Sequence, residues 1–142
     1  MSRLSVLLAL LAAFLSANAV AHEVRPAYLE IRETAPEQYD ILWKTPARGA
    51  ATIRLEVALP QSCSETVPRV TVGDGAANAE RWSVSCEGGL AGEEIRIDGL
   101  DRTLVETIAR FERLDGMSQS VRLMSGETSF VAAEPSTFIG VA

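Results

Sequence analysis

The chain has 142 residues, of which 47% are hydrophobic, and its formal net charge is −6 at pH 7. This is the length of one ordinary domain. The acidic balance, with no cluster of basic residues, argues against binding to nucleic acid or to anionic membrane surfaces. We therefore interpret the excess of carboxylates as a solvated acidic surface.

The first 21 residues have the pattern of a cleavable signal peptide. Arg3 is the positive residue, an apolar run extends from Leu4 to Leu15, and Ala19-Val20-Ala21 has the small residues of a cleavage site. The apolar run is about a dozen residues, whereas a membrane-spanning helix needs roughly 20. Cleavage after the alanine motif would make His22 the new amino terminus, although Ala17-Asn18-Ala19 offers a weaker, earlier site. We expect export to the periplasm.

Cysteine usage agrees with export. Cys63 and Cys86 are the only two cysteines of the chain, and an even number in an exported protein predicts a disulfide. Their spacing fits neither a C-x-x-C redox motif nor a zinc motif. The bond would close a loop of about 24 residues, which corresponds to roughly 3 kcal/mol in the chain-entropy model.

The remainder of the chain alternates apolar and polar residues as β-strands do. The predicted strands cover residues 24–33, 38–45, 52–59, 67–72, 80–87, 93–98, 108–114, 118–124 and 128–132, and turns rich in Pro and Gly separate them. This spacing predicts a single all-β domain at 22–134, an immunoglobulin-like β-sandwich of about eight or nine short strands. Residues 135–142 form a tail.

The alternation also predicts which side chains face the core. Leu29 and Ile31 lie opposite Tyr28 and Glu30 in the first strand. Tyr39, Ile41 and Trp43 share one face of the second strand, and Trp82, Val84 and Cys86 share one face of the fifth. We expect both tryptophans in or near the core, beside the cysteine pair. Aromatic residues could instead line a ligand cleft, but core filling is the favoured role.

One stretch, from Leu104 to Leu114, is ambiguous. Leu104, Ile108 and Phe111 have the spacing of one face of a helix. The same residues from position 108 onward also suit a strand that enters a hairpin turn at Asp115-Gly116. We favour the strand, because the next predicted strand follows at hairpin distance.

No catalytic constellation is evident. A Ser-His-Asp triad needs an internal histidine to carry the proton. The sole histidine, His22, is expected at the mature terminus, and no G-x-S-x-G motif occurs. We therefore predict no catalytic residues and no enzymatic activity, and an exported hydrolase is the least favoured hypothesis.

The amino-terminal histidine supports one alternative. Its α-amine and a ring nitrogen could together hold copper or nickel, metals that imidazole suits, and Glu23 lies next to it. Tight sites usually recruit a second histidine or a sulfur ligand, and this chain has no other histidine. The main expectation is no cofactor, and a small periplasmic copper- or nickel-binding protein centred on His22 is the alternative.

Several blocks of sequence resemble one known family. The segment His22-Glu23-Val24-Arg25-Pro26-Ala27-Tyr28-Leu29-Glu30-Ile31, directly after the signal, resembles the start of the exported region of HupE/UreJ-like membrane proteins. The segment from Tyr39 to Gly49 resembles the same family, as do Ile97-Asp98-Gly99-Leu100 and Phe130-Val131. The residues that carry the two more specific blocks are Glu23, Arg25, Pro26, Tyr28, Trp43, Pro46, Arg48 and Gly49.

The resemblance implies a periplasmic β-domain that precedes several transmembrane helices. The family is named for hydrogenase and urease accessory proteins, some of them implicated in nickel uptake. It implies a non-catalytic accessory, recognition or assembly role at the outer face of the inner membrane. The implied partner is the transmembrane region of the same or a neighbouring protein, and residues 135–142 would lead into such a region. On this interpretation residues 22–142 do not themselves move an ion.

Overall fold

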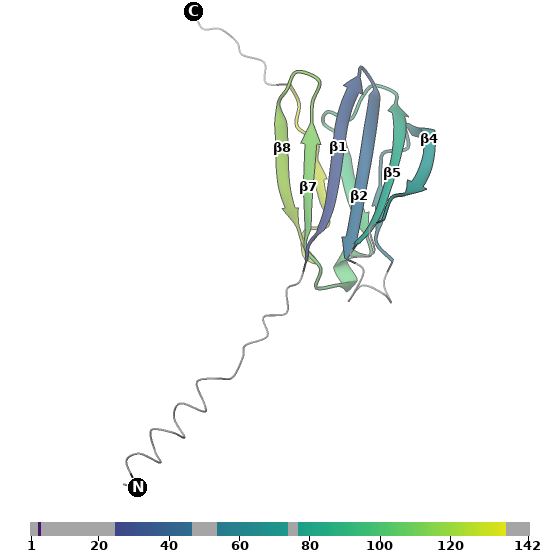
Figure 1. Cartoon of the computed structure of the whole chain (residues 1–142). Coiled ribbons are helices and arrows are strands. Elements are labelled where there is room, and N and C mark those ends of the chain that lie inside the picture. Colours follow the sequence, from purple (N-terminus) through teal and green to yellow (C-terminus); the bar gives the residue numbers. More distant parts are fainter. Residues whose placement is uncertain (1–2, 4–24, 47–53, 74–76, 136–142) are drawn as a thin grey trace, which may run out of the picture.

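The computed structural model describes Arg3 and residues 25–46, 54–73 and 77–135 (Figure 1). The regular elements of the described residues from 25 onward are β-strands and one short 3₁₀ helix, η1, at Leu100–Arg102. The strands are β1 Ala27–Ala35, β2 Gln38–Pro46, β3 Glu56–Ala58, β4 Cys63–Thr71, β5 Ala77–Cys86, β6 Glu94–Asp98, β7 Thr107–Glu112, β8 Ser118–Leu123 and β9 Ser129–Val131. The prediction of an all-β chain of short strands is confirmed.

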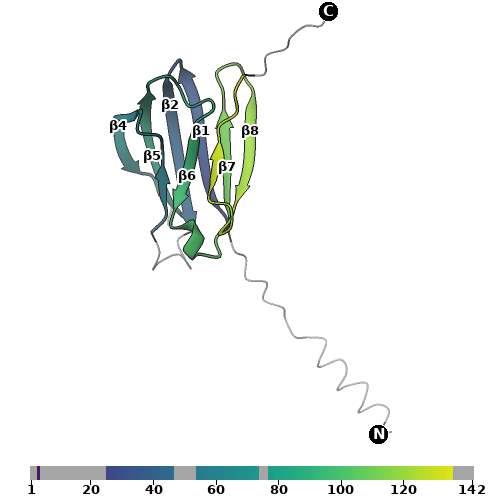
Figure 2. The same ribbon diagram turned by 180° about the vertical axis from the view of Figure 1, so that it is seen from behind.

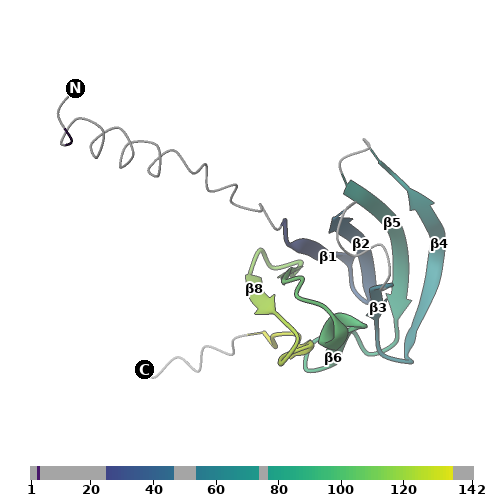
Figure 3. The ribbon, with the colours of Figure 1, turned by 90° about the horizontal axis from the view of Figure 1, so that it is seen from below.

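Two sheets form a β-sandwich. The larger sheet has six strands in the order β4-β5-β2-β1-β7-β8, and the smaller has three in the order β3-β6-β9. Strand β1 lies inside the larger sheet, antiparallel to β2 and parallel to β7. Figures 1 and 2 show the two layers from opposite sides, and Figure 3 shows the larger sheet curving around β3 and β6. The predicted sandwich architecture is confirmed.

The core consists of the alternate residues that the sequence pattern selects. Leu29 and Ile31 of β1 are fully buried, and the three core residues predicted for β2 are at most 3% exposed. The core side chains of β5 are Trp82, Val84 and Cys86. Ile95 and Ile97 of β6 meet them from the smaller sheet. Period-2 alternation therefore places both tryptophans in the core, as expected.

The ambiguous stretch is a strand. Strand β7 pairs with β8 from Thr107 to Glu112 without a register shift. Leu104 is 94% exposed and Ile108 is 41% exposed, while Phe111 is buried. The helical interpretation fails because these three side chains do not share a buried face.

Two strands, β3 and β4, differ most from their predicted bounds. The predicted strand 52–59 has strand pairing only over β3, and residues 52 and 53 lie outside the described residues. Gly99, at φ +89°, ends the partner strand β6, and a Cβ there would lie 2.6 Å from the carbonyl oxygen of Arg54. The backbone before β3 therefore passes close to the turn at Gly99, and the pairing of β3 with β6 ends at Glu56 and Asp98.

Strand β4 begins earlier than predicted and contains Pro68. Its register against β5 shifts between Glu65 and Val67 and again between Val67 and Val70. A proline and bulges are tolerated because β4 is an edge strand. Most of its side chains are exposed, so the apolar alternation that would have revealed its first residues is missing.

The predicted disulfide between Cys63 and Cys86 is present. The two cysteines are direct register partners, at the start of β4 and the end of β5. Cys86 is fully buried and Cys63 packs against the core. The bond thus attaches an irregular edge strand to its only neighbour in the sheet.

Arg69 attaches the second half of β4 to the rest of the sandwich. Its guanidinium carbon lies 4.0 Å from the centroid of the Trp82 ring, a cation–π contact. The guanidinium also pairs with Glu65 at 3.2 Å and reaches Glu56 of β3 at 3.4 Å. Because β3 belongs to the smaller sheet, Arg69 links the two layers across one open side of the sandwich.

Replacing Cys63 and Cys86 together by alanine should lower the free energy of unfolding by about 3 kcal/mol, because the unfolded chain gains the freedom of the open loop. Urea unfolding of the oxidised chain and of the double variant measures this difference. A reductant should destabilise the wild-type chain by a similar amount and leave the double variant unchanged. Equal midpoints for both chains under oxidising conditions would contradict the stabilising role of the bond.

Candidate functional site

The outer face of the larger sheet carries a depression of about 240 Å³. We call it the Leu42 depression, after the buried apolar residue on the outward face of β2 that lines it. The residues that line it are Glu30, Arg32, Asp40, Ile41, Leu42, Val67, Val70, Arg81, Trp82 and Ser83. They come from β1, β2, β4 and β5, four neighbouring strands of one sheet. The depression is thus built on paired strands and not on loops.

Strand register sets the order of side chains across this face. Val70, Arg81, Leu42, Glu30 and Arg110 form one row from β4 to β7. A second row consists of Val67, Ser83, Asp40, Arg32 and Glu112. Because alternate residues point to opposite faces, the inward positions of Ile41 and Trp43 oblige Asp40, Leu42 and Lys44 to point outward.

Apolar groups form the floor and one wall. Leu42 points away from the core and is nevertheless only 8% exposed, because neighbouring outward side chains surround it. Val67 and Val70 of β4 are 51% and 53% exposed. The register shifts on either side of Val67 displace the regular pairing of β4 at the position of this wall.

The β1–β7 side of the face has its charges paired. Arg32 donates to Glu30 Oε1 at 3.0 Å and to Glu112 Oε2 at 2.9 Å. Arg110 donates to the other oxygen of Glu112 at 2.8 Å. Tyr28 completes the group by donating its hydroxyl to Glu30 Oε2 at 3.0 Å. Each of these carboxylates has both oxygens occupied, so this half of the face is electrostatically neutralised.

On the β5–β2 side of the same face, the charged side chains are not paired with one another. Asp40 accepts a hydrogen bond of 2.6 Å from Ser83 Oγ. Within the described ranges, Arg81 and Lys44 form no ion pair with any carboxylate. Both side chains are exposed. Leu42 therefore has an unpaired cation opposite it on β5 and another two residues along its own strand.

The pairing on the β1–β7 side shifts the pKa values of Tyr28, Arg32 and Glu112, and the hydrogen bond to Glu112 raises that of Arg32. Partial burial, the hydrogen bond to Glu30 and the charge of that carboxylate raise the pKa of Tyr28 above its ordinary value of 10.0. The hydrogen bond from Arg32, assisted by Arg110, lowers the pKa of Glu112. Glu112 therefore remains ionised at neutral pH and keeps both arginines occupied.

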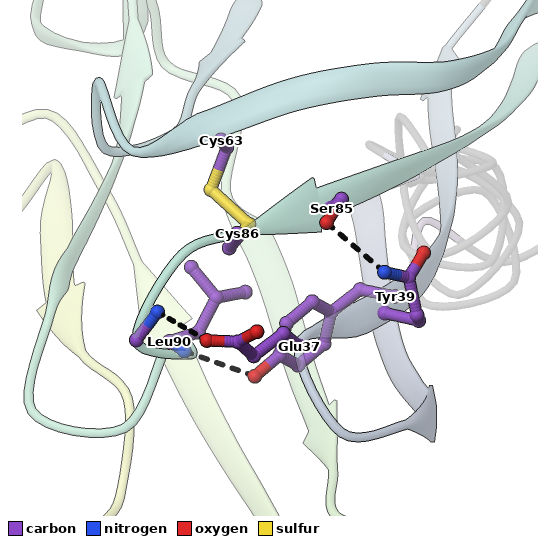
Figure 4. Close-up of a disulfide and its surroundings, with 8 residues drawn as sticks. Glu37, Tyr39, Cys63, Ser85, Cys86 and Leu90 are labelled. Carbon is purple, nitrogen blue, oxygen red and sulfur yellow. Dashed lines mark hydrogen bonds between the residues drawn. A yellow bond between two sulfur atoms is a disulfide. The ribbon is translucent and has the colours of Figure 1, made fainter.

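A second cluster of polar contacts joins two turns beside the disulfide (Figure 4). Glu37, in the turn between β1 and β2, has φ 63°, a left-handed conformation that costs free energy for a residue with a Cβ. Its carboxylate accepts a hydrogen bond from Gly88 N at 2.6 Å, and its carbonyl accepts one from Cys86 N at 2.9 Å. These contacts fasten the turn to the end of β5.

Tyr39 secures the same end of the sandwich. Its buried hydroxyl accepts a hydrogen bond from Leu90 N at 2.9 Å, and burial raises the pKa of Tyr39. A Cβ added at Gly89 would lie 3.2 Å from this hydroxyl, so the turn fits closely around the ring. The polar groups of Glu37 and Tyr39 are thus occupied by hydrogen bonds within the fold. We assign both residues to the stability of the fold and not to the binding of a ligand.

The residues of the family-like blocks are spread over the fold. His22, Glu23, Arg48 and Gly49 lie outside the described residues. Arg25 and Pro26 are exposed and directly precede β1. The other three separate: Tyr28 lies on the outer face, Trp43 in the core, and Pro46 at the end of β2. The described members therefore form no common site.

The described part of the chain contains no group of three or more His, Cys, Asp or Glu side chains placed to hold a metal ion. No helix among those residues is long and apolar enough to cross a membrane. The chain matches none of the protein families and none of the curated proteins with which it was compared.

The depression was not predicted from the sequence. A local signal for it exists in β2, where Leu42 is the single apolar residue between Asp40 and Lys44 on the outward face. The partners Arg81 and Val70 lie on other strands, and their proximity follows only from the register. Arg69 was missed for the same reason.

The chain contains two tyrosines, and we expect both to ionise above pH 10.0 in the folded state. Their neutral phenols stabilise the fold below the unfolded pKa, and this contribution is lost as the pH rises through the folded pKa values. Tyrosinate absorbance measured against pH, with and without denaturant, tests this. Tyr28→Phe should leave one raised transition, that of Tyr39. A folded midpoint at or below the denatured one would contradict the expectation.

Proposed function

We propose that this chain is an exported, non-catalytic recognition domain that binds a partner through the outer face of its larger sheet. The observation that carries the proposal is the Leu42 depression. Among the residues that the structure describes, no other strand covers this face, which offers apolar surface beside two unpaired cations. Such a combination of an apolar centre and unsatisfied polar groups suits an interaction surface.

The rigidity of the face supports a binding role. The lining residues lie on four paired strands, and the ion pairs around Arg32 fix the charges beside them. Little conformational entropy would be lost when a partner docks on such a surface. A disulfide suits an oxidising compartment, in agreement with the signal-like start of the chain.

The resemblance of the blocks that begin at His22 and Tyr39 narrows the proposal. We propose that the domain belongs to a HupE/UreJ-type membrane protein and acts as an accessory module linked to nickel uptake. It would lie in the periplasm at the outer face of the inner membrane. Its partner would be the transmembrane region of the same or a neighbouring protein.

Expression from its own start codon in a Gram-negative bacterium tests the cellular part of the proposal. We expect periplasmic material whose amino-terminal sequence begins at His22, because the small residues before it suit signal peptidase. Leu8→Arg interrupts the apolar run and should retain the chain in the cytoplasm. A wild-type chain that keeps its first residues and stays in the cytoplasm would refute export.

The same strain tests the partner. A photoreactive amino acid at Val70 should cross-link the domain to a membrane protein encoded in the same or an adjacent reading frame. Val131, 57% exposed on β9 of the smaller sheet, is the matched control position and should give no such product. Equal cross-linking from both positions, or none from Val70, would refute binding of a membrane partner through the outer face.

The metal-binding alternative has a separate test. If the mature amino terminus chelates copper or nickel, His22→Ala should abolish the binding of either metal in a titration of the exported chain, because the ring nitrogen is lost. On our proposal the variant and the wild-type chain bind these metals equally weakly. A loss of at least tenfold in affinity in the variant would favour the alternative.

A further inference from the structure

The outer face of the larger sheet has a charge opposite to that of the whole chain. The formal net charge of the chain is −6. On the outward positions of the larger sheet, by contrast, five basic residues outnumber three acidic ones. The basic residues are Arg32, Lys44, Arg81, Arg110 and Arg122, and the acidic residues are Glu30, Asp40 and Glu112. An acidic ligand would therefore be repelled by most of the surface and accepted on this face.

The cations of this face that are in no ion pair among the described residues lie in and beside the Leu42 depression, which Asp40 also lines. Arg32 and Arg110 are occupied by Glu30 and Glu112, and Arg122 pairs with Glu106 in the loop before β7. The two remaining cations are Arg81, opposite Leu42 on β5, and Lys44, two residues beyond Leu42 on β2. Neither is in an ion pair with another described residue, so both can meet an anionic group that approaches the apolar floor.

The size of the depression limits what can occupy it. Its volume of about 240 Å³ lies below the roughly 300–1,000 Å³ of typical sites for small molecules and cofactors. It suits one or two side chains that rest on Leu42 against the wall formed by Val67 and Val70. An apolar side chain with a carboxylate close to it would match both the floor and the cations.

We propose that the Leu42 depression binds a short acidic segment of a partner protein, in which an apolar side chain is flanked by Asp or Glu. The apolar side chain rests on Leu42 and Val70, and a neighbouring carboxylate accepts hydrogen bonds from Arg81, with Lys44 as a second cation. Arg81 and Lys44 repel basic segments from the same place, while Asp40 accepts a hydrogen bond from Ser83 and Glu30 is paired with Arg32. This inference rests on the proposed recognition role and adds the chemistry of the partner.

Binding of synthetic peptides to the exported chain tests the inference. One fluorescent peptide has a leucine flanked by glutamates, a second replaces the glutamates by lysines, and a third replaces the leucine by serine. Saturable binding is expected for the first peptide only, and it should weaken as salt is added because the contacting charges are screened. Absence of binding by the first peptide, or equal binding of the acidic and basic peptides, would overturn the proposal.

Charge reversal locates the site. Arg81→Glu should weaken the acidic peptide about tenfold or more, because a charge-assisted contact becomes a repulsion. Arg102→Glu changes the net charge equally, and Arg102 is an exposed residue of η1 that lies outside the depression. It should leave the affinity within about twofold, the scale of a long-range screened effect. Equal losses of affinity in both variants would show that the effect comes from net charge alone. That result would overturn the assignment of the binding site to the Leu42 depression.

Two further measurements separate the possible failures. The Arg81→Glu variant should unfold at the same urea concentration as the wild-type chain, since Arg81 is exposed. If it does not, Arg81→Gln removes the charge without reversing it. That variant should still lower the affinity for the acidic peptide. The cross-link from Val70 to a membrane protein does not depend on the peptides. A cross-link without peptide binding would refute the acidic-segment inference alone, whereas peptide binding without a cross-link would refute the proposed membrane partner.

Discussion

The register of β2 between β1 and β5 determines both faces of the larger sheet. Tyr39, Ile41 and Trp43 are buried against the smaller sheet, and burying side chains of this size stabilises the fold by about 1.5–3 kcal/mol each. A slip of one residue would expose all three and bury Asp40 and Lys44 in their place. The same register sets Arg81 opposite Leu42 and Glu30 on its other side. The candidate site is therefore a consequence of how the core is packed.

The edge strand β4 forms the valine wall of the Leu42 depression. Its bulges displace it from regular pairing, and Pro68 removes one backbone donor. Such a strand would be weakly held by backbone hydrogen bonds alone. The disulfide fixes its first residue to β5, and Arg69 fixes its second half through Trp82 and Glu56. These two attachments allow the valine wall to keep its position although the pairing is irregular.

The parts of the fold that could be predicted are those encoded by neighbouring residues. The strand faces of β1, β2 and β5 follow from period-2 alternation, and the cysteine pair follows from its even count behind a signal-like start. Strand β3 was predicted too long because its limit depends on Gly99, more than 40 residues away in the sequence. Strand β4 was predicted too short because an exposed edge needs no alternation. The depression and Arg69 depend on contacts between distant strands, which no local pattern encodes.

Stability and recognition use different forces in this molecule. The core is almost wholly apolar; Thr107 is the only polar side chain among the described buried residues. The ion pairs around Arg32 are exposed, and such pairs contribute roughly 0–1 kcal/mol each. Their main consequence is to occupy the charges of one half of the face, which leaves Arg81 and Lys44 as the cations open to a ligand. Salt screens exposed charges far more than it weakens apolar burial. The fold can therefore persist under conditions in which the face no longer distinguishes an acidic partner from a basic one.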